Sequence, residues 1–482
     1  MEQDIRALLV SFGYVGACVV VGEVAARRGV SRELARKFIH VSVGLWIFGT
    51  LGLFASRAWA VVPSLVAAVA NAVIHRKRLL KSVEAEPENL GTVWFPVSYS
   101  VLVWTAWDRP VVAAGGVLAM AVGDALASLV GRRFGRHRYE TLEGQHKSLE
   151  GSLAMLGGTF VAVLLVLDVL PGLSPGMPRV PLALLCAVVA TCVEALGTRG
   201  RDNLWVPLAT GAVLAWVPAE HAFGLGVGAA LALFIGRASW ARGSLSPSGV
   251  LGAVLVGTPV FGLAGGMGAA ALLGFFVSSS VLSKLFRARK AEVEAEYAKT
   301  GTRDLGQALA NGGVAALAAV LLGVTGEARF GLAMLGALAA ANADTWATEL
   351  GVLARSPPRL LTTLRRVPAG TSGAVSGLGM LAATAGAFFV GGVAALAGAP
   401  WAWVPGVVAA GVVGSLVDSL LGATVQDVRW CEACARETER RVHRCGRDTR
   451  PLRGFAWLGN DTVNVLATLA GALLAFAAGG LG

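Results

Sequence analysis

Apolar runs of about twenty residues, separated by short polar stretches, recur along the whole chain. We count sixteen, each near the length that a helix needs to cross ~30 Å of hydrocarbon. The pattern predicts an all-α, polytopic transmembrane protein with about sixteen membrane segments, of which some Gly-rich ones can be re-entrant or buried. The segments lie at residues 7–26, 39–55, 57–74, 90–107, 110–131, 152–170, 181–198, 203–218, 221–236, 248–264, 265–284, 306–325, 329–352, 372–398, 401–423 and 461–480.

The basic residues gather between these segments. Of the 41 Lys and Arg residues, 36 fall in eight loops, and two crossings between successive loops would put all eight on one side. The positive-inside rule makes that side the cytoplasm. We expect an integral, multi-pass protein of a bacterial plasma membrane with its active sites facing the cytoplasm. The loops are Arg27–Lys37, Arg76–Lys81, Arg132–Lys147, Arg199–Arg201, Arg237–Arg242, Lys284–Arg303, Arg355–Arg366 and Arg429–Arg453.

Composition supports this picture. With 55% hydrophobic and 15% charged residues among 482, the chain is not an ordinary soluble protein. The net charge of +11 belongs to loops that meet lipid headgroups, so nucleic acid is not an expected partner. The first apolar segment lacks a preceding basic region and is interpreted as a retained helix. A Gly/Ser/Pro-rich connection at Arg237–Gly249 predicts two fused modules, residues 1–220 and 240–482.

Unusual polar motifs mark the first module. Arg36 and His40 share a helical face at the start of a membrane segment and can hold phosphate or move a proton, or serve as topology and interface residues. Asp124 stands within an apolar helix, where a carboxylate is costly and by default functional. Its small neighbours suit either magnesium-polyphosphate binding or helix packing. These neighbours are Gly123, Ser128 and Gly131.

A second group follows the fifth segment. Lys147 and Ser148 open a helix, where free N–H groups favour anions, and Glu150 follows them. The glycine spacing of a P-loop is absent and no nearby strand is evident, so a P-loop fold is excluded. Glu194 ends the seventh segment. Asp202 and Asn203 open the next, as either a helix cap or part of a site.

Together, RKxxH, GDALASLVGRRFG, KSLEGS and RDNLWVP, in that order over residues 30–215, resemble the phytol kinase/dolichol kinase family of membrane prenol kinases. The resemblance implies transfer of a nucleotide γ-phosphate, typically from CTP, to the hydroxyl of a long isoprenoid alcohol. It also implies that Asp124 binds the magnesium–nucleotide and that Lys147, Ser148 and Glu150 line the phosphate site.

The second module carries different motifs. At the end of its thirteenth segment, Asp344 and Glu349 lie among hydroxyl and amide side chains, which suits magnesium coordination or bonding between helices. Asp418 closes the fifteenth segment and completes the catalytic candidates. Further phosphate-binding candidates lie on polar helix faces or in a glycine-rich turn: Asp304, Gln307, Asn311, Thr371, Ser372, Gln426, Asn460, Asp461 and Asn464.

The loop before the last segment holds Cys431, Cys434, His443 and Cys445. These four residues offer the ligands of a structural zinc site, although the second pair is closer than common zinc spacings; the alternative is reduced, unligated cysteines.

The order RDLGQALANGG, ANADTWATELG, PAGTSGAVSG, DSLLGATVQ and NDTVN resembles the phytyl-phosphate kinase family over residues 245–480. The two resemblances imply a bifunctional salvage enzyme that makes a prenyl monophosphate from phytol, geranylgeraniol or farnesol and then the diphosphate. The expected phosphoryl donor is a nucleoside triphosphate, CTP by the resemblance, and the expected cofactor is Mg²⁺. The alternatives are a CTP-dependent cytidylyltransferase and an isoprenoid-phosphate or lipid transporter.

Overall fold

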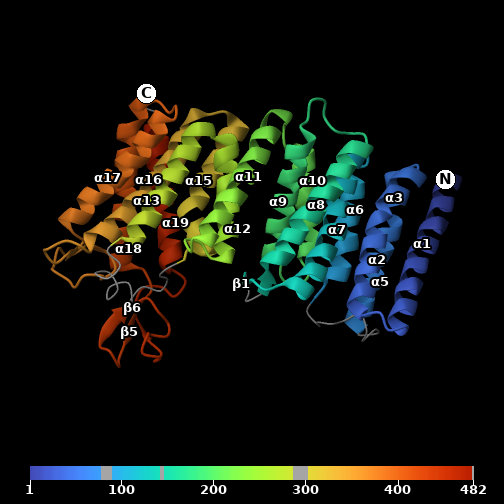
Figure 1. Ribbon diagram of the computed structural model, residues 1–482, viewed down its shortest axis with the longest axis horizontal. Coiled ribbons are helices and arrows are strands. Elements are labelled where there is room, and N and C mark those ends of the chain that lie inside the picture. Colours follow the sequence, from blue (N-terminus) through green and yellow to red (C-terminus); the bar gives the residue numbers. More distant parts are fainter. Residues whose placement is uncertain (78–88, 142–145, 286–301, 480–482) are drawn as a thin grey trace. The chain divides into compact units, whose positions relative to one another are not determined.

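The computed structural model describes residues 1–77, 89–141, 146–285 and 302–479 (Figure 1). Parts of three predicted basic loops, Arg76–Lys81, Arg132–Lys147 and Lys284–Arg303, lie outside the described residues. The chain divides into two compact units, Met1–Gly226 (unit 1) and Val227–Gly482 (unit 2). Each unit is a bundle of helices.

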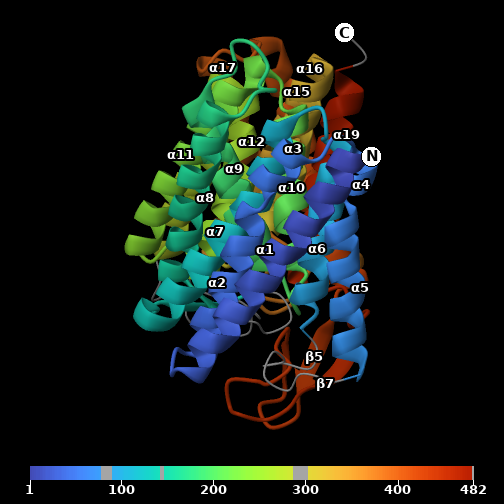
Figure 2. The same ribbon diagram turned by 90° about the vertical axis from the view of Figure 1, so that its right-hand side faces the viewer.

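Unit 1 is built around α7, which is buried from Val111 to Ala121 among the other helices. Helix α8 packs along α7, as do α10 and α2, while α1 lies beside α2 (Figure 2). The helices are α1 (Glu2–Arg27), α2 (Arg32–Leu45), α3 (Ile47–Leu53), α4 (Arg57–Ala60), α5 (Val62–Lys77), α6 (Gly91–Thr105), α7 (Pro110–Phe134), α8 (Leu149–Val169), α9 (Arg179–Leu196) and α10 (Asp202–Trp216); α11 (Ala219–Ala241) carries the chain across the boundary.

Unit 2 is likewise built around one central helix, α16, which is buried from Leu332 to Ala343. Helices α17, α18, α19 and α15 pack against it. The helices are α12 (Pro247–Leu263), α13 (Gly265–Lys284), α15 (Leu305–Thr325), α16 (Ala328–Gly351), α17 (Gly377–Leu396), the 3-10 turn η2 (Trp401–Trp403), α18 (Val404–Thr424) and α19 (Asn460–Ala478).

The all-α membrane architecture is confirmed. In the described residues, eleven helices are long and apolar enough to cross a membrane. The other five predicted segments fall short for visible reasons. The segment at 39–55 is broken between α2 and α3, and α16 carries a polar C-terminal third. Helices α6, α10 and α12 have only 15, 15 and 17 residues and contain Pro96, Pro207 and Pro259.

Serine caps set several helix starts. The hydroxyls of Ser148, Ser246 and Ser376 each accept a hydrogen bond from the N–H of a glycine three residues on. These caps begin α8, α12 and α17.

Short strands lie in the polar loops, where the sequence predicted none. In unit 1, β1 (Arg138–Glu140) pairs with β2 (His146–Ser148) in antiparallel register, with Tyr139 opposite Lys147. The expectation that no strand lies near Lys147 was therefore wrong. A two-stranded antiparallel hairpin still differs from the strand–loop–helix of a P-loop.

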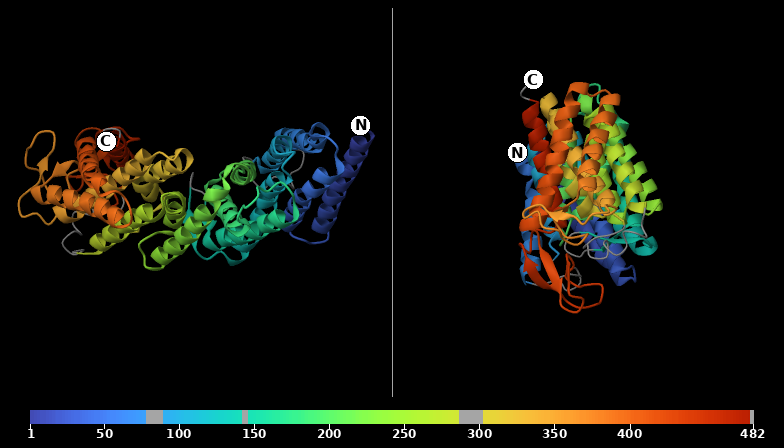
Figure 3. Two further views of the ribbon diagram at one scale, coloured as in Figure 1. Left: turned by 90° about the horizontal axis from the view of Figure 1, so that it is seen from above. Right: turned by 90° about the vertical axis from the view of Figure 1, so that its left-hand side faces the viewer.

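Unit 2 has a two-stranded pair, β3 (Arg359–Leu360) with β4 (Ala374–Val375), and a three-stranded antiparallel sheet in the order β6-β5-β7. The latter comprises β5 (Val428–Cys431), β6 (Arg436–Thr438) and β7 (Arg450–Arg453). It projects from one end of the helices of unit 2 (Figure 3).

Small residues set the closest helix contacts of unit 2. A Cβ on Gly471 of α19 would lie 2.7 Å from the carbonyl oxygen of Gly336 on α16 and 3.3 Å from that of Ala410 on α18. By contrast, a Cβ on Gly392 of α17 would meet nothing within 4 Å. Backbone atoms cannot turn aside as side chains can, so Gly471 is a requirement of this crossing.

We therefore expect Gly471→Ala to lower the free energy of unfolding by about 1–3 kcal/mol through overpacking. The matched change Gly392→Ala should leave it unchanged or raise it, because alanine favours helix. Thermal unfolding in one detergent compares the two. Equal stability of both variants would contradict this packing.

Candidate functional site

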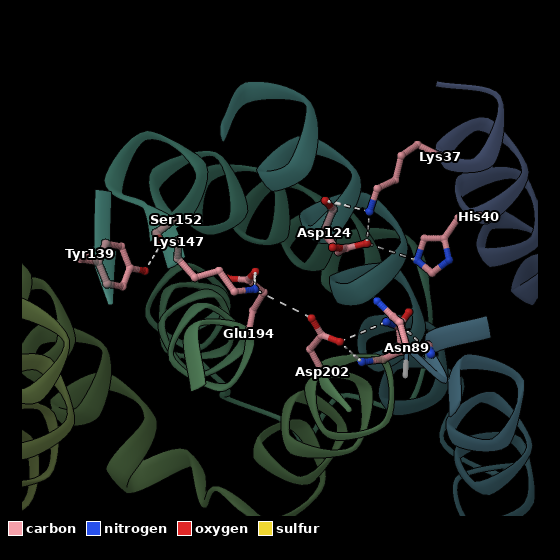
Figure 4. Close-up of polar contacts among 11 residues, drawn as sticks. Lys37, His40, Asn89, Asp124, Tyr139, Lys147, Ser152, Glu194 and Asp202 are labelled. Carbon is pink, nitrogen blue, oxygen red and sulfur yellow. Dashed lines mark hydrogen bonds and ion pairs between the residues drawn. The ribbon is translucent and has the colours of Figure 1, made fainter. Parts of the chain in front are cut away.

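Polar side chains meet at one end of the unit 1 helices (Figure 4). Lys37 of α2 lies beside Asp124 of α7, with 2.5 Å between Nζ and Oδ2, and their side chains are only 9% and 16% exposed. The Nε2 atom of His40 lies 3.9 Å from the same carboxylate oxygen. This Nε2 is buried without a hydrogen-bond partner among the described residues. Lys37 and His40 thus place a cation and a second polar group beside the largely buried carboxylate of Asp124.

Lys147 supplies the second cation of this array. It forms an ion pair with Glu194 of α9 and lies 3.9 Å from Oδ2 of Asp202 on α10. Burial alone would lower the pKa of Lys147, but the carboxylates of Glu194, Asp202 and Asp124 outweigh it and raise the pKa above its usual range. Lys147 is therefore an ammonium at neutral pH. We call Lys37, Asp124, Lys147, Glu194 and Asp202 the unit 1 array.

The β1–β2 hairpin positions Lys147. Tyr139 of β1 lies opposite Lys147 and is buried. The hydroxyl of Tyr139 lies 2.6 Å from the Oγ of Ser152 on α8. Burial raises the pKa of Tyr139 to about 12, so the phenol stays neutral. Ser148 caps α8, whereas Glu150 lies 2.7 Å from Nδ1 of His137. Ser148 is thus tied to the helix start and Glu150 to His137.

Three more candidates of the first module contribute to helix packing or to a hydrogen bond with a nearby side chain. A Cβ on Gly123 would lie 2.6 Å from Sδ of Met155, and one on Gly131 3.0 Å from Oγ of Ser148, so both glycines admit α8 against α7. Ser128 donates to Glu33 at 2.7 Å.

Two candidates lie next to residues of the site in the sequence. Arg36 is half-buried and forms no ion pair with a described residue. Asn203 donates through its backbone N–H to Asp202 Oδ1 at 3.0 Å. Asp202 faces Lys147 and is itself the first residue of α10, since Arg201 holds the cap position.

Two members of the array were missing from the predicted site. The sequence placed Lys37 among the basic residues of the loop Arg27–Lys37 and gave Glu194 no role. Glu194 carries the same signal as Asp124, a carboxylate at the end of an apolar segment. Lys37 has no such signal, because its partner is 87 positions away in the sequence.

Unit 2 has its own buried carboxylates. Asp344 of α16 receives a hydrogen bond from Ser415 of α18 and interacts electrostatically with Asp418, one turn further along α18. The Oδ2 atom of Asp418 is buried and has no hydrogen-bond partner among the described residues. The sequence suggested Asp344 with Glu349, but the carboxylate that approaches Asp344 is Asp418, while Glu349 interacts with Arg303.

The glycine-rich loop Pro368–Gly377 reaches the end of α18 near this pair. Ser372 donates to Oε1 of Gln426 at 2.7 Å, and the Nε2 of Gln426 donates to Glu439 at 2.9 Å. Arg453 donates to the carbonyl oxygens of Ser372, at 3.2 Å, and of Ala423. The loop is thereby bound to residues that flank β6 and end β7. Thr371 instead donates to Pro368 within the loop.

On another side of α16 lies a largely apolar cavity of about 90 Å³. Its polar lining is Arg303, Gln307, Asn311 and Thr345, and its apolar lining includes Phe275 and Phe276. Burial lowers the pKa of Arg303, an effect opposed by Glu349. A cavity of this composition suits a molecule with an apolar body and an anionic end.

Five of the candidates lie at helix starts. Asp304 and Gln307 form a capping box at α15, so Asp304 has a structural partner. Asn460, Asp461 and Asn464 lie in the first two turns of α19, which packs against α16 and α18.

The predicted cysteine and histidine ligands come together. The ligand atoms of Cys431, Cys434, His443 and Cys445 all lie within 4.8 Å of one another, and Cys431 and His443 are buried. We call them the Cys/His cluster. A hydrogen bond with His443 lowers the pKa of Cys445 to about 6.

Comparisons with known proteins agree with a membrane location. The family model "Integral membrane protein DUF92" matches residues 230–472. "Protein PGR" of Arabidopsis thaliana is 34% identical over 257 residues, covering 48% of this chain and 88% of that protein. The "Phytol kinase" of a Synechocystis species is 34% identical over 214 residues, 42% of this chain and 87% of that enzyme. No solved structure matches the chain.

Lys147→Met should lower the free energy of unfolding by about 3 kcal/mol, because it leaves Glu194 as an uncompensated buried charge. The double variant Lys147→Met/Glu194→Met should recover part of that loss. Arg179→Met, which breaks an exposed pair with Asp168, is the control and should cost less than about 1 kcal/mol. Thermal unfolding in detergent measures all three, and a loss from Lys147→Met no larger than the control's would contradict the buried pair.

Proposed function

The chain belongs to the DUF92 family of integral membrane proteins, and we propose that it is an isoprenoid-alcohol kinase. Unit 1 transfers a phosphoryl group from a nucleoside triphosphate, CTP by resemblance, to the hydroxyl of a prenol. Unit 2 transfers a second phosphoryl group to the resulting monophosphate. The first step is supported by the kinase named among the relatives and by the motifs of residues 30–215. The second rests on the motifs of residues 245–480 and on the chemistry of unit 2.

The observation that carries the proposal is that each unit buries its own cluster of carboxylates, with two lysines among them in unit 1 and a glycine-rich loop beside them in unit 2. In unit 1, three carboxylates converge with Lys37 and Lys147. In unit 2, Asp344 and Asp418 adjoin a glycine-rich loop that Arg453 holds. Phosphoryl transfer needs mainly positioning and neutralisation of charge, and these are the groups that supply both.

In unit 1, the two lysines would bind the β- and γ-phosphates of the donor. Lys147 is held by the β1–β2 hairpin, so its charge is fixed in place before the nucleotide arrives. The reaction breaks the bond between the γ-phosphorus and the β–γ bridging oxygen and forms one to the prenol oxygen, which loses its proton. His40, whose buried Nε2 lies near Asp124, would receive this proton.

The donor set fits a divalent cation in unit 2. Magnesium prefers carboxylate oxygens, and the buried Oδ2 of Asp418 has no hydrogen-bond partner among the described residues. Asp344 and Asp418 would hold the ion there. In unit 1, Asp124, Glu194 and Asp202 are the oxygen donors. When bound, magnesium neutralises charge on the phosphates.

The composition of the cavity of unit 2 supports the proposal that it binds part of the acceptor. Its aromatic and aliphatic lining suits a segment of an isoprenoid chain, and Arg303 suits the phosphate end. The guanidinium carbon of Arg303 lies 5.9 Å from the ring centre of Phe275 and 5.7 Å from that of Phe276. Arg303 is thus kept at the wall of the cavity.

Purified protein in lipid nanodiscs should be incubated with Mg²⁺, with phytol, geranylgeraniol or farnesol, and with CTP, UTP, GTP or ATP in turn. Mass spectrometry of the lipids should find monophosphate first and diphosphate later, with one nucleoside diphosphate released per phosphate. Release of pyrophosphate would instead indicate nucleotidyl transfer. No nucleotide-dependent product with any prenol or added monophosphate would overturn the proposal.

The two steps should be separable by substitution. Asp124→Asn should lower monophosphate formation roughly 10²-fold or more, while added prenyl monophosphate is still converted. Asp344→Asn should do the reverse, so that monophosphate accumulates. Asp168→Asn and Glu327→Gln, which alter exposed ion pairs, are the matched controls for units 1 and 2 and should change neither step. Loss of both steps in a folded single variant would contradict separate sites.

A further inference from the structure

We infer that the Cys/His cluster binds one zinc ion and that the zinc-bound sheet β6-β5-β7 positions the glycine-rich loop of unit 2. Only the expected effect of the loop position on activity rests on the proposed function. The metal and its effect on the loop can be tested without any assay of catalysis.

The cluster has the chemistry of a structural zinc site. Three thiols and one imidazole are a common tetrahedral set, and with Zn–S bonds of 2.3 Å neighbouring sulfurs lie about 3.8 Å apart. The Sγ atoms of Cys431 and Cys445 are 3.6 Å apart, and Nδ1 of His443 is 3.2 Å from Sγ of Cys445. These two distances, and the 4.8 Å within which all four ligand atoms lie, are compatible with the corners of such a tetrahedron.

The backbone around the ligands gives a second, independent indication. Ala435 directly follows Cys434 and has a φ of 50°, while Gly446 directly follows Cys445 and has a φ of 79°. A left-handed alanine is costly, by about 1 kcal/mol, and persists where its surroundings require it. Each of the two ligand pairs, Cys431/Cys434 and His443/Cys445, is thus followed directly by a residue in a left-handed conformation.

Apolar burial contributes little to holding this part of the chain in place. The sheet is three short strands, and among the residues of β6 and β7 most are exposed. Cys431 ends β5, Cys434 lies in the turn to β6, and His443 lies in the loop to β7. One ion would therefore link all three strands, which apolar burial in so small a sheet cannot do.

The sheet in turn holds the site of unit 2. Glu439, one residue beyond β6, accepts a hydrogen bond from Gln426, and Gln426 accepts one from Ser372 in the glycine-rich loop. Arg453, at the end of β7, donates to the carbonyl oxygen of Ser372. Glu439 also interacts electrostatically with Asp418. Loss of the ion would release Glu439 and Arg453, and with them the loop.

Metal analysis of the protein purified without chelator should find one zinc per chain. Cys431→Ser and His443→Ala should each reduce zinc at least about tenfold, while Cys18→Ser, in α1, should retain it. Absence of zinc from the wild type, its retention in the double variant Cys431→Ser/Cys434→Ser, or a native disulfide between cluster cysteines would overturn the metal site.

Hydrogen exchange then tests the coupling. In Cys431→Ser, amides of the glycine-rich loop should exchange about tenfold faster than in the wild type, because the hydrogen bonds through Glu439 and Arg453 are lost. Amides of β1 and β2 in unit 1 should be unchanged. Unchanged exchange of the loop in a zinc-free, folded variant would overturn the positioning role. If the proposed function holds, conversion of added monophosphate falls in the same variant while phosphorylation of the prenol does not.

Discussion

The central constraint on this protein is that each unit buries a carboxylate in the helix at its core. Helices α7 and α16 are enclosed by other helices, and each ends in a polar stretch that carries Asp124 or Asp344. A carboxylate in such surroundings costs several kcal/mol unless charges or hydrogen bonds match it. The elements packed around α7 supply Lys37, from α2, and Lys147, from β2, and those around α16 supply Ser415, from α18, and the glycine-rich loop near Asp418. Much of the packing of α2, α9, α10 and α18 can be understood as bringing these partners into place.

Much of this was predictable from the sequence, and the reasons for the failures are physical. A carboxylate in an apolar segment is visible in one dimension, so Asp124, Asp344 and Asp418 could be chosen directly. Their partners depend on which helices touch, and a basic residue such as Lys37 looks the same whether it faces lipid headgroups or a buried acid. Among the described residues, eleven of the sixteen predicted segments form helices that are long and apolar enough to cross a membrane, because hydropathy alone cannot distinguish a short, proline-containing helix such as α6 from a longer one.

The loops show the same limit. Strands of two to four residues, such as β2 and β5, are too short for an alternating pattern to be read. The Cys/His cluster was visible as a set of ligand types. Its connection to Ser372 through Gln426 and Glu439 was not, because hydrogen bonds between loops leave no sequence period.

The proposed pair of sites in one chain would suit a product that remains in the bilayer. A prenyl monophosphate stays in the membrane, so a second site in the same chain meets it at a higher effective concentration than a separate enzyme would. The account requires that each unit performs its step alone. Mixing purified Asp124→Asn with purified Asp344→Asn in the same lipid vesicles tests this directly, with prenol and nucleotide supplied. The account predicts diphosphate in the mixture and none from either variant alone; a mixture that stays without diphosphate, although Asp344→Asn makes monophosphate and Asp124→Asn converts added monophosphate, would contradict it.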